Sequence, residues 1–211
     1  MDILYFNELD STQIYLIEQI KRGNLSAPIA IVAKRQTNGI GSRDNSWEGG
    51  DGNLFLSFAV DMEDLPEDLP LNSVSIYYSY IMKELLERFR SNIWLKWPND
   101  LYYNESKIGG TITKKIDTVL LCGIGINLKK NSNSFEALNL NIEVDSLLKE
   151  YIEEVEKYPS WKQIFSKFAL EFGLSKRVSA HIHGEYKSLE NAILSQDGSL
   201  IINNKRVYSL R

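Results

Sequence analysis

The sequence predicts an α+β fold, in which a mixed β-sheet with flanking helices precedes a small C-terminal β-barrel. Short apolar runs bounded by turn residues alternate with segments whose apolar residues recur at helical spacing. From residue 177 onward, this alternation gives way to short runs separated by tight-turn residues. With 211 residues and 43% hydrophobic content, the chain is long enough to bury a sizeable core.

The N-terminal part of the chain predicts a strand, a capped helix and two further strands. Residues 3–6 form the first apolar run, and Asp10-Ser11-Thr12 then supplies N-cap chemistry for a helix. Residues 28–33 and 53–60 have the composition of strands. Between them, residues 36–52 contain five glycines among polar residues, so we expect a long loop there.

The central part predicts a second core helix and three strands. The helix spans residues 72–90. Its apolar side chains at helical spacing are Val74, Tyr77, Ile81, Leu85 and Phe89. A strand over residues 93–96 stops at Pro98. Residues 106–113 and 118–126 are expected to pair as strands that turn near residues 115–117.

The C-terminal part predicts two amphipathic helices and then a change of architecture. The helices cover residues 144–157 and 161–172. The turn pairs that follow are His183-Gly184, Asp197-Gly198 and Asn203-Asn204. We therefore predict a main domain over residues 1–173 and a small β-barrel domain over residues 174–211.

Composition excludes several classes of protein. The formal net charge is −4, from 24 basic and 28 acidic residues, so the basic footprint of a general nucleic-acid binder is missing. The single cysteine, Cys122, excludes an intramolecular disulfide and gives no metal-ligand cluster. The N-terminal segment lacks a secretory pattern, and no apolar run approaches the length of a membrane span. We expect a soluble, cytoplasmic protein that binds neither nucleic acid nor a membrane.

Two short strings carry most of the chemistry. Lys96-Trp97-Pro98-Asn99-Asp100 presents a lysine, an amide and a carboxylate around a turn, and Asp100 suits Mg²⁺ or an amine. Further on, Lys107-Ile108-Gly109-Gly110 places a cation on a strand whose glycines let a phosphate or carboxylate approach the backbone. Taken singly, these strings also fit a polar turn around a buried Trp97 and an edge strand with a solvated lysine.

Three weaker signals accompany them. The glycine-rich loop over residues 36–52, with Arg43 and Trp47, is able to close over an anion but matches neither the P-loop nor the dinucleotide fingerprint. Gly123-Ile124-Gly125-Ile126-Asn127 ends a buried strand with a side-chain amide. Asp10-Ser11-Thr12 is a plain helix cap in most proteins.

The order and spacing of these strings resemble those of the bacterial biotin-protein ligases, from about residue 2 to the C-terminus. The matching segments are Asp10-Ser11-Thr12, Gln36, Gly39-Ile40-Gly41, Trp47, Gly52-Asn53-Leu54, Lys96 to Asp100, Lys107 to Gly110 and Gly125-Ile126-Asn127. The resemblance implies a class II synthetase-like catalytic domain, an SH3-like C-terminal barrel, and ATP- and Mg²⁺-dependent activation of biotin to biotinyl-5′-AMP. The resemblance also implies that the acceptor is a lysine of a biotin carboxyl carrier protein, the acetyl-CoA carboxylase subunit. It is compatible with a homodimer.

The resemblance also assigns roles to individual residues. Those implied to bind biotin are Ser11, Thr12, Gln36, Gly39, Lys107, Gly109 and Gly110. Those implied to bind ATP or the adenylate are Arg43, Trp47, Asn99, Lys107 and Asn127. The catalytic set is Lys107, Asp100, Lys96 and Arg43, with Asp100 as the expected ligand of Mg²⁺.

Two features depart from the family pattern. Repressor-type members carry an N-terminal helix-turn-helix, whereas nine residues precede Asp10 here, so we expect no repressor activity. In the glycine-rich loop, the residues that replace expected arginines are Ile40, Ser42 and Asn45. Arg43 is then expected either to take over the phosphate contact or to form a surface ion pair.

Two alternatives stay open beside this interpretation. A lipoate-protein ligase shares the fold and the adenylation chemistry, although the string from Lys96 to Asp100, with Gln36 and Gly52-Asn53, favours biotin. A non-enzymatic module that binds biotin or a nucleotide as a sensor would lack ATP–pyrophosphate exchange. Because every motif residue of the first half-reaction precedes residue 131, we expect removal of residues 177–211 to reduce transfer more than adenylation.

Overall fold

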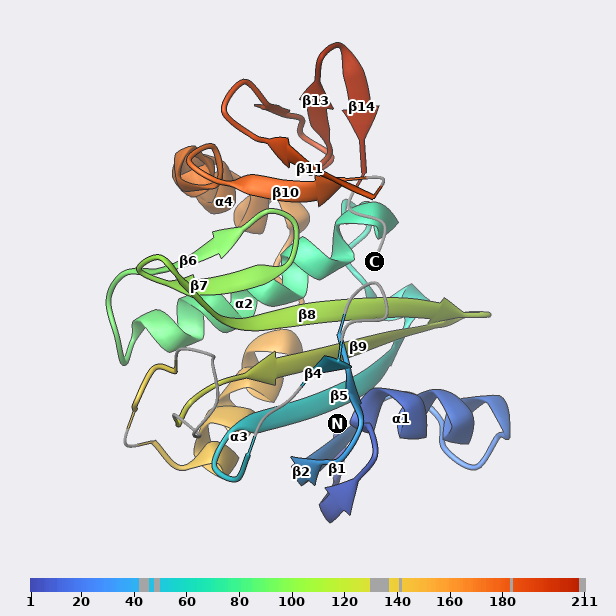
Figure 1. Ribbon diagram of the computed structural model, residues 1–211. Coiled ribbons are helices and arrows are strands. Elements are labelled where there is room, and N and C mark those ends of the chain that lie inside the picture. The colour runs from blue at the N-terminus through green and yellow to red at the C-terminus, as the bar shows by residue number, and fades with distance from the viewer. Residues whose placement is uncertain (42–45, 48–49, 130–136, 141, 183, 209–211) are drawn as a thin grey trace.

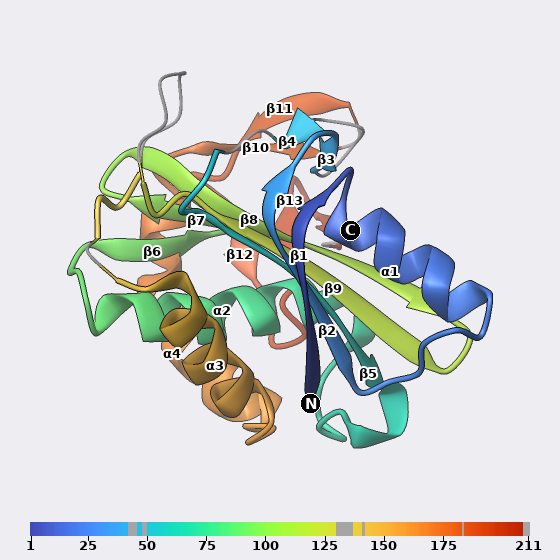
Figure 2. The same ribbon diagram turned by 90° about the horizontal axis from the view of Figure 1, so that it is seen from below.

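A seven-stranded mixed sheet forms the centre of the molecule, with helices on both faces (Figures 1 and 2). The computed structural model describes residues 1–41, 46–47, 50–129, 137–140, 142–182 and 184–208. The sheet strands are β1 (Asp2–Leu9), β2 (Ile29–Gln36), β5 (Leu54–Asp61), β6 (Ile93–Lys96), β7 (Asp100–Tyr103), β8 (Ser106–Ile116) and β9 (Val119–Ile126). Their order is β1-β2-β5-β9-β8-β7-β6, with β1 and β2 parallel and the other neighbours antiparallel. The predicted α+β fold with a mixed sheet is confirmed.

One face of the sheet is covered by α1 (Thr12–Lys21). Ser11 caps this helix as predicted, because its side chain accepts a hydrogen bond from the backbone N–H of Ile14. Leu16 points inward and packs against alternate residues of the strands: Ile29, Ile31, Ala59 and Leu121. This small apolar cluster fixes the start of α1 against the sheet.

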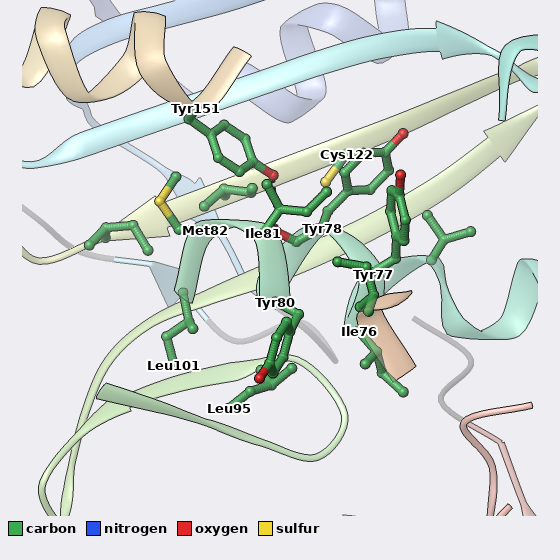
Figure 3. Packing of buried hydrophobic residues seen from close by; sticks show 14 of the residues in the cluster. Ile76, Tyr77, Tyr78, Tyr80, Ile81, Met82, Leu95, Leu101, Cys122 and Tyr151 are labelled. Carbon is green, nitrogen blue, oxygen red and sulfur yellow. Dashed lines mark hydrogen bonds between the residues drawn. The ribbon is translucent and has the colours of Figure 1, made fainter. Parts of the chain in front are cut away.

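The opposite face carries the main core, built around α2 (Val74–Glu87), with α3 (Val144–Val155) and α4 (Trp161–Ser175) beside it. Tyr77, Tyr78 and Tyr151 are fully buried, and Figure 3 shows their rings gathered near Cys122. Burial of an aromatic or aliphatic side chain of this size contributes roughly 1.5–3 kcal/mol. Complete burial also raises the pKa of the Cys122 thiol well above its ordinary value, so the unpaired cysteine is chemically quiet.

The C-terminal strands form two small antiparallel sheets beyond the edge strand β6 (Figure 1). They are β10 (Ser179–Ile182), β11 (Glu185–Ser188), β12 (Ile193–Leu194), β13 (Leu200–Ile202) and β14 (Lys205–Val207). Positive φ angles at Gly184, Gly198, Asn203 and Asn204 agree with the predicted turns, while His183 lies outside the described residues. Ala180, Ile182, Leu189, Ala192, Leu200 and Val207 belong to the same apolar cluster as α2. A domain boundary near residue 173 stays a prediction, and α4 continues through Ser175.

Several local elements differ from the predictions. Residues 36–52 were expected to be a loop, but their described part contains a short hairpin, β3 (Gly39–Ile40) and β4 (Ser46–Trp47). β7 was missed because a four-residue strand directly after a proline turn has no periodicity to detect. β8 runs on to Ile116, and the turn falls at Asp117, whose φ is 49°. The remaining described elements are short 3-10 helices, η2 (Met62–Asp64) and η3 (Leu71–Ser73). None of the described helices is long and apolar enough to cross a membrane.

Candidate active site

A pocket opens on the α1 side of the sheet, between the start of α1, the β3–β4 hairpin, the start of β7 and the adjacent parts of β5, β8 and β9. Its empty volume is about 450 Å³, part of it open to solvent. The lining residues are Ser11, Thr12, Gln13, Gln36, Ile40, Gly41, Trp47, Leu56, Ser57, Asn99, Asp100, Lys107, Gly110, Thr111, Ile112, Gly123, Ile124 and Gly125. Most of the strings singled out in the sequence therefore meet in one place.

Strand register arranges the pocket floor in two rows. Asp100, Gly110 and Gly125 are neighbours across β7, β8 and β9. Two residues further along β8 and β9, Ile112 and Gly123 are neighbours, and Gly123 pairs with Ser57 on β5. By the rise of a β-strand, the rows lie about 7 Å apart. One row belongs to a charged end of the pocket and the other to an uncharged end.

The uncharged end is lined by amides and hydroxyls. The side-chain oxygen of Gln36 accepts hydrogen bonds from the backbone N–H of Thr12, at 2.8 Å, and from its hydroxyl, at 3.1 Å. The hydroxyl of Thr12 also lies 2.9 Å from that of Ser57. Gln36 thus ties the end of β2 to the first turn of α1, which fixes the shape of this end.

Side chains lie directly on the two glycines of β9. A Cβ built on Gly125 would lie 2.5 Å from the indole of Trp47. A Cβ built on Gly123 would lie 2.7 Å from the side-chain oxygen of Gln13. Any larger residue at either position would displace these side chains, so the Gly-x-Gly pattern is explained by close approach.

The charged end is an ion pair at the pocket mouth. Lys107 Nζ lies 2.6 Å from Asp100 Oδ1, and the two side chains are 34% and 19% exposed. The same ammonium lies 5.9 Å from the centre of the Trp47 ring. Burial, helped by the charge of Asp100, raises the pKa of the neighbouring Tyr102 to about 12, so this phenol stays protonated. An ion pair that remains partly exposed is able to open when an anionic ligand competes for the lysine.

Asn99 is buried beneath this pair and is held by the backbone. Its amide nitrogen donates to the carbonyl oxygen of Thr111, and Thr111 N–H donates back to Asn99 O at 3.0 Å. Its amide oxygen has no hydrogen-bond partner among the described residues. Asn99 therefore presents an acceptor, which suits a donor group of a ligand better than a phosphate oxygen.

Comparison with known proteins identifies the family. The model of the biotin/lipoate A/B protein ligase family matches residues 5–131, which is more than half of the chain and includes every described lining residue of the pocket. The chain belongs to the biotin/lipoate A/B protein ligase family. The predicted resemblance is thereby confirmed.

Individual relatives of this ligase family agree. The chain is 40% identical to the biotin acetyl coenzyme A carboxylase synthetase of Helicobacter pylori, a structure with bound biotinylated ATP, with a TM-score of 0.93 over 98% of this chain and 99% of that one. It is 25% identical to the bifunctional ligase/repressor BirA of Escherichia coli over 96% of its own length, but it spans only 63% of that relative. The biotin protein ligase of Aquifex aeolicus, with biotin and ATP, has the same fold, with a TM-score of 0.72 and 24% identity over 100% of this chain and 96% of that one.

The structure places the residues implied by the ligase resemblance in three groups. Those that line the pocket are Ser11, Thr12, Gln36, Trp47, Asn99, Asp100, Lys107 and Gly110. Gly39, Lys96, Gly109 and Asn127 lie outside the described lining. Gly39 packs against the backbone of Trp47, and Lys96 Nζ lies 3.4 Å from the hydroxyl of Tyr102. Arg43 lies outside the described residues, as do Ser42 and Asn45.

Gln13 and Ser57, which belong to the uncharged end of the pocket, were assigned no role from the sequence. Gln13 directly follows the Asp10-Ser11-Thr12 cap and is buried on the first turn of α1. Its position next to the cap was the signal in the sequence that could have identified it as a pocket residue. Asn53, by contrast, is structural, because its side-chain oxygen accepts the backbone N–H groups of Leu128 and Lys129, both at 2.9 Å.

The strand that leads into the Lys96–Asp100 string is held by α4. β6 is the last strand of the sheet, so its outward backbone groups have no strand partner. Leu95 N–H donates to Glu171 Oε1 at 3.2 Å, and Trp97 N–H donates to Ser175 Oγ at 3.0 Å. Two side chains of α4 therefore position the segment at the edge of the pocket without lining the pocket themselves.

Proposed function

We propose that the protein is a biotin-protein ligase, which activates biotin with ATP to biotinyl-5′-AMP and transfers the biotinyl group to a lysine of a biotin carboxyl carrier protein. The main observation behind this proposal is the polarity of the pocket: Lys107 and Asp100 form one end, and Thr12, Gln13, Gln36 and Ser57 form the other. Biotin has the matching polarity, with a carboxylate at one end and a neutral urea ring at the other. Similarity to the Helicobacter pylori enzyme over nearly the full length supports the same activity.

In the first half-reaction, a biotin carboxylate oxygen bonds to the α-phosphorus of ATP and pyrophosphate leaves. Both reactants are anionic, so the site must offset their repulsion and hold them in line. Lys107 meets this need when it exchanges Asp100 for the carboxylate and phosphate oxygens. Mg²⁺ would accompany ATP, and Asp100 would be the carboxylate that holds it, because Mg²⁺ usually takes one or two carboxylates from a protein beside the substrate phosphates.

In the second half-reaction, the carrier lysine must attack as a free amine. Its nitrogen bonds to the acyl carbon of the mixed anhydride, AMP leaves, and the amine loses a proton. Asp100 lies at the pocket mouth beside Lys107, where its carboxylate orients the incoming ammonium and accepts the proton. We place the carrier in acetyl-CoA carboxylase and the ligase in the cytoplasm.

ATP–pyrophosphate exchange with biotin, compared with lipoic acid, tests this assignment. Exchange with biotin alone is the expected result. Exchange with lipoic acid alone would favour a lipoate-protein ligase, and exchange with neither acid would favour a non-enzymatic sensor. Sedimentation of the purified protein with and without biotinyl-5′-AMP tests whether it forms a homodimer.

A further inference from the structure

The pocket face of the sheet continues beyond the charged end of the pocket. Tyr102 lies two residues further along β7 than Asp100, and side chains two positions apart on a strand share a face. Its neighbours in register are Trp94 on β6 and Lys107 on β8, the strands beside β7 in Figure 1. These three residues form an outer row, about 7 Å beyond the row of Asp100 by the rise of a β-strand.

The hydroxyl group of Tyr102 has a donor that the described residues do not use. Lys96 Nζ donates to the hydroxyl oxygen at 3.4 Å. No described residue accepts the phenol proton. The ring itself is held in place, because its centre lies 4.9 Å from that of Trp94, whose indole N–H donates to the carbonyl oxygen of Asn104 at 2.6 Å. Tyr102 therefore presents a fixed, unused O–H group beside an ammonium group.

The charges around this hydroxyl group favour an anion. Lys96 and Lys107 flank Asp100: the first is its neighbour in register, and the second contacts its carboxylate at 2.6 Å. Two ammonium groups and one carboxylate leave this cluster with a net positive charge. Ammonium and phenol groups present donors, so the matching ligand carries negative charge and acceptor oxygens. A phosphate group has both.

The proposed first half-reaction brings such a group to the outer row. A biotin carboxylate oxygen bonds to the α-phosphorus of ATP, while the bond from this phosphorus to the β-phosphate oxygen breaks. Pyrophosphate leaves with the electron pair of that bond, and the attacking and leaving oxygens are roughly in line. When biotin extends inward from Lys107 toward the uncharged end of the pocket, the leaving oxygen lies on the opposite, outer side. The β- and γ-phosphates are then next to Tyr102 and Lys96.

We propose that Tyr102 is a substrate-binding residue for the leaving group, whose phenol O–H donates a hydrogen bond to a pyrophosphate oxygen of ATP beside the ammonium of Lys96. This inference rests on the proposed function, and it deepens it by naming the residues that receive the two phosphates that leave. The transfer half-reaction involves no pyrophosphate, so it does not need the phenol hydroxyl. The two half-reactions therefore respond differently to its loss.

Tyr102→Phe removes the hydroxyl group alone and tests this proposal. The matched control is Tyr103→Phe, because Tyr103 is the next residue of β7, points to the other face and accepts a 2.8 Å hydrogen bond from Arg90. Formation of ATP from biotinyl-5′-AMP and pyrophosphate gives the KM of pyrophosphate. Transfer from preformed biotinyl-5′-AMP to a biotin carboxyl carrier domain gives the KM of the carrier. The melting temperature of each ligand-free variant is measured in parallel.

We expect Tyr102→Phe to raise the KM of pyrophosphate about 10-fold, which corresponds to one lost hydrogen bond to a charged group. The KM of the carrier and the rate of transfer should stay within twofold of wild type, because pyrophosphate takes no part in that step. Lys96→Met should raise the same KM of pyrophosphate. Tyr103→Phe should change neither KM by more than twofold, and the melting temperature of Tyr102→Phe should equal that of the wild type.

The contradicting results are separable from failure of the proposed function. A KM of pyrophosphate within twofold of wild type in Tyr102→Phe would overturn this role of Tyr102 while leaving the ligase assignment intact. A raised KM confined to the carrier would overturn it as well and make the outer row a docking surface for the acceptor. Equal losses in both half-reactions with a lowered melting temperature would make the residue structural. A wild-type protein that forms no ATP from biotinyl-5′-AMP and pyrophosphate would overturn both proposals.

Discussion

The indole N–H of Trp97 donates a 2.9 Å hydrogen bond to the carbonyl oxygen of Gly198, a residue 101 positions further along the chain. Trp97 sits between Lys96 and the pocket residues Asn99 and Asp100, whereas Gly198 lies in the turn before β13. The same turn accepts a hydrogen bond from Ser73 through Asp197 O and one from Trp161 through Gln196 O. The C-terminal strands are thus attached to the segment that carries the charged end of the pocket.

Gly198→Ala should destabilise the protein and slow adenylation together. A Cβ on Gly198 would lie 2.2 Å from Ser73 Oγ, and its φ of 76° is strained for alanine, so we expect a loss of about 1–3 kcal/mol. Gly184→Ala is the control, because its φ is 87° but no atom lies within 4 Å of the added Cβ. Urea unfolding of the two variants separates packing from backbone strain. Equal losses of unfolding free energy in the two variants would mean that the close contact between Gly198 and Ser73 contributes nothing.

This attachment changes the expected effect of removing residues 177–211. From the sequence, transfer was expected to suffer more than adenylation. The structure leads to a different prediction, because truncation would expose the shared core and leave the N–H of Trp97 and that of Trp161 without their carbonyl partners. We predict comparable loss of both half-reactions. A soluble truncated protein with wild-type pyrophosphate exchange would contradict it.

Lys107→Met should remove adenylate formation without unfolding the protein. The side chain is one-third exposed, and among the described residues its ion pair is with Asp100, so the fold does not depend on it. Loss of one such electrostatic donor typically lowers a rate by about 10²–10³. Biotin-dependent pyrophosphate exchange measures the effect, and Lys167→Met, in a surface pair with Glu84, is the matched control. Exchange within threefold of wild type would disprove the role of Lys107.

Gly110→Ala and Gly125→Ala should impair different properties of the protein, the first its substrate binding and the second its stability. A Cβ on Gly125 meets the Trp47 indole at 2.5 Å, whereas one on Gly110 meets its nearest protein atom at an ordinary 3.4 Å. Gly125→Ala should therefore lower the ligand-free melting temperature, and Gly110→Ala should leave it unchanged while weakening substrate binding. Calorimetry with biotin and thermal unfolding provide both readouts. A lower melting temperature for Gly110→Ala would show that its glycine serves the fold.

Lys83→Met should make stability strongly dependent on pH. Lys83 is nearly buried and pairs with Glu171 at 2.7 Å and Glu87 at 2.9 Å. Burial raises the pKa of Glu171 above its ordinary value, although Lys83 works to lower it. A raised folded-state pKa means that stability is present below the unfolded pKa and lost as pH rises through the folded one. Without Lys83, this loss should grow to about 3–5 kcal/mol at neutral pH.

Urea unfolding of Lys83→Met between pH 5 and pH 8 measures that dependence. The variant should approach wild-type stability at the acidic end, where Glu171 is protonated. Lys167→Met, which breaks an exposed pair, should cost at most about 1 kcal/mol at either pH. If Lys83→Met lowered the free energy of unfolding equally at pH 5 and pH 8, an uncompensated charge on the buried Glu171 would not explain the loss.

The sequence was informative where local chemistry decides the structure. The Ser11 cap, the strand periods and the positive-φ turns at Gly184, Gly198 and Asn203-Asn204 follow from local rules, and each was predicted. The strands β7, β3 and β4 are only two to four residues long, so they are too short to show a periodic pattern in the chain.

The site was predictable only in part for the same reason. Lys107, Asp100 and the glycines of β9 stand in recognisable strings. The use of the Gln36 oxygen by Thr12, and the unpartnered oxygen of Gln13, arise from the packing of α1 against β2 and β9. No spacing within the chain distinguishes these two glutamines. Which of the two side-chain oxygens is already hydrogen-bonded appears only when donors and acceptors are matched in three dimensions.

Mass spectrometry of a biotin carboxyl carrier domain, incubated with this protein, biotin, ATP and Mg²⁺, tests the central claim most directly. The account predicts the mass increase of one biotinyl group on one lysine, dependent on ATP and absent with Lys107→Met. The carrier domain must be one that another biotin-protein ligase modifies, so that it is a competent acceptor. An unmodified carrier in the presence of the folded wild-type protein would contradict the proposed function.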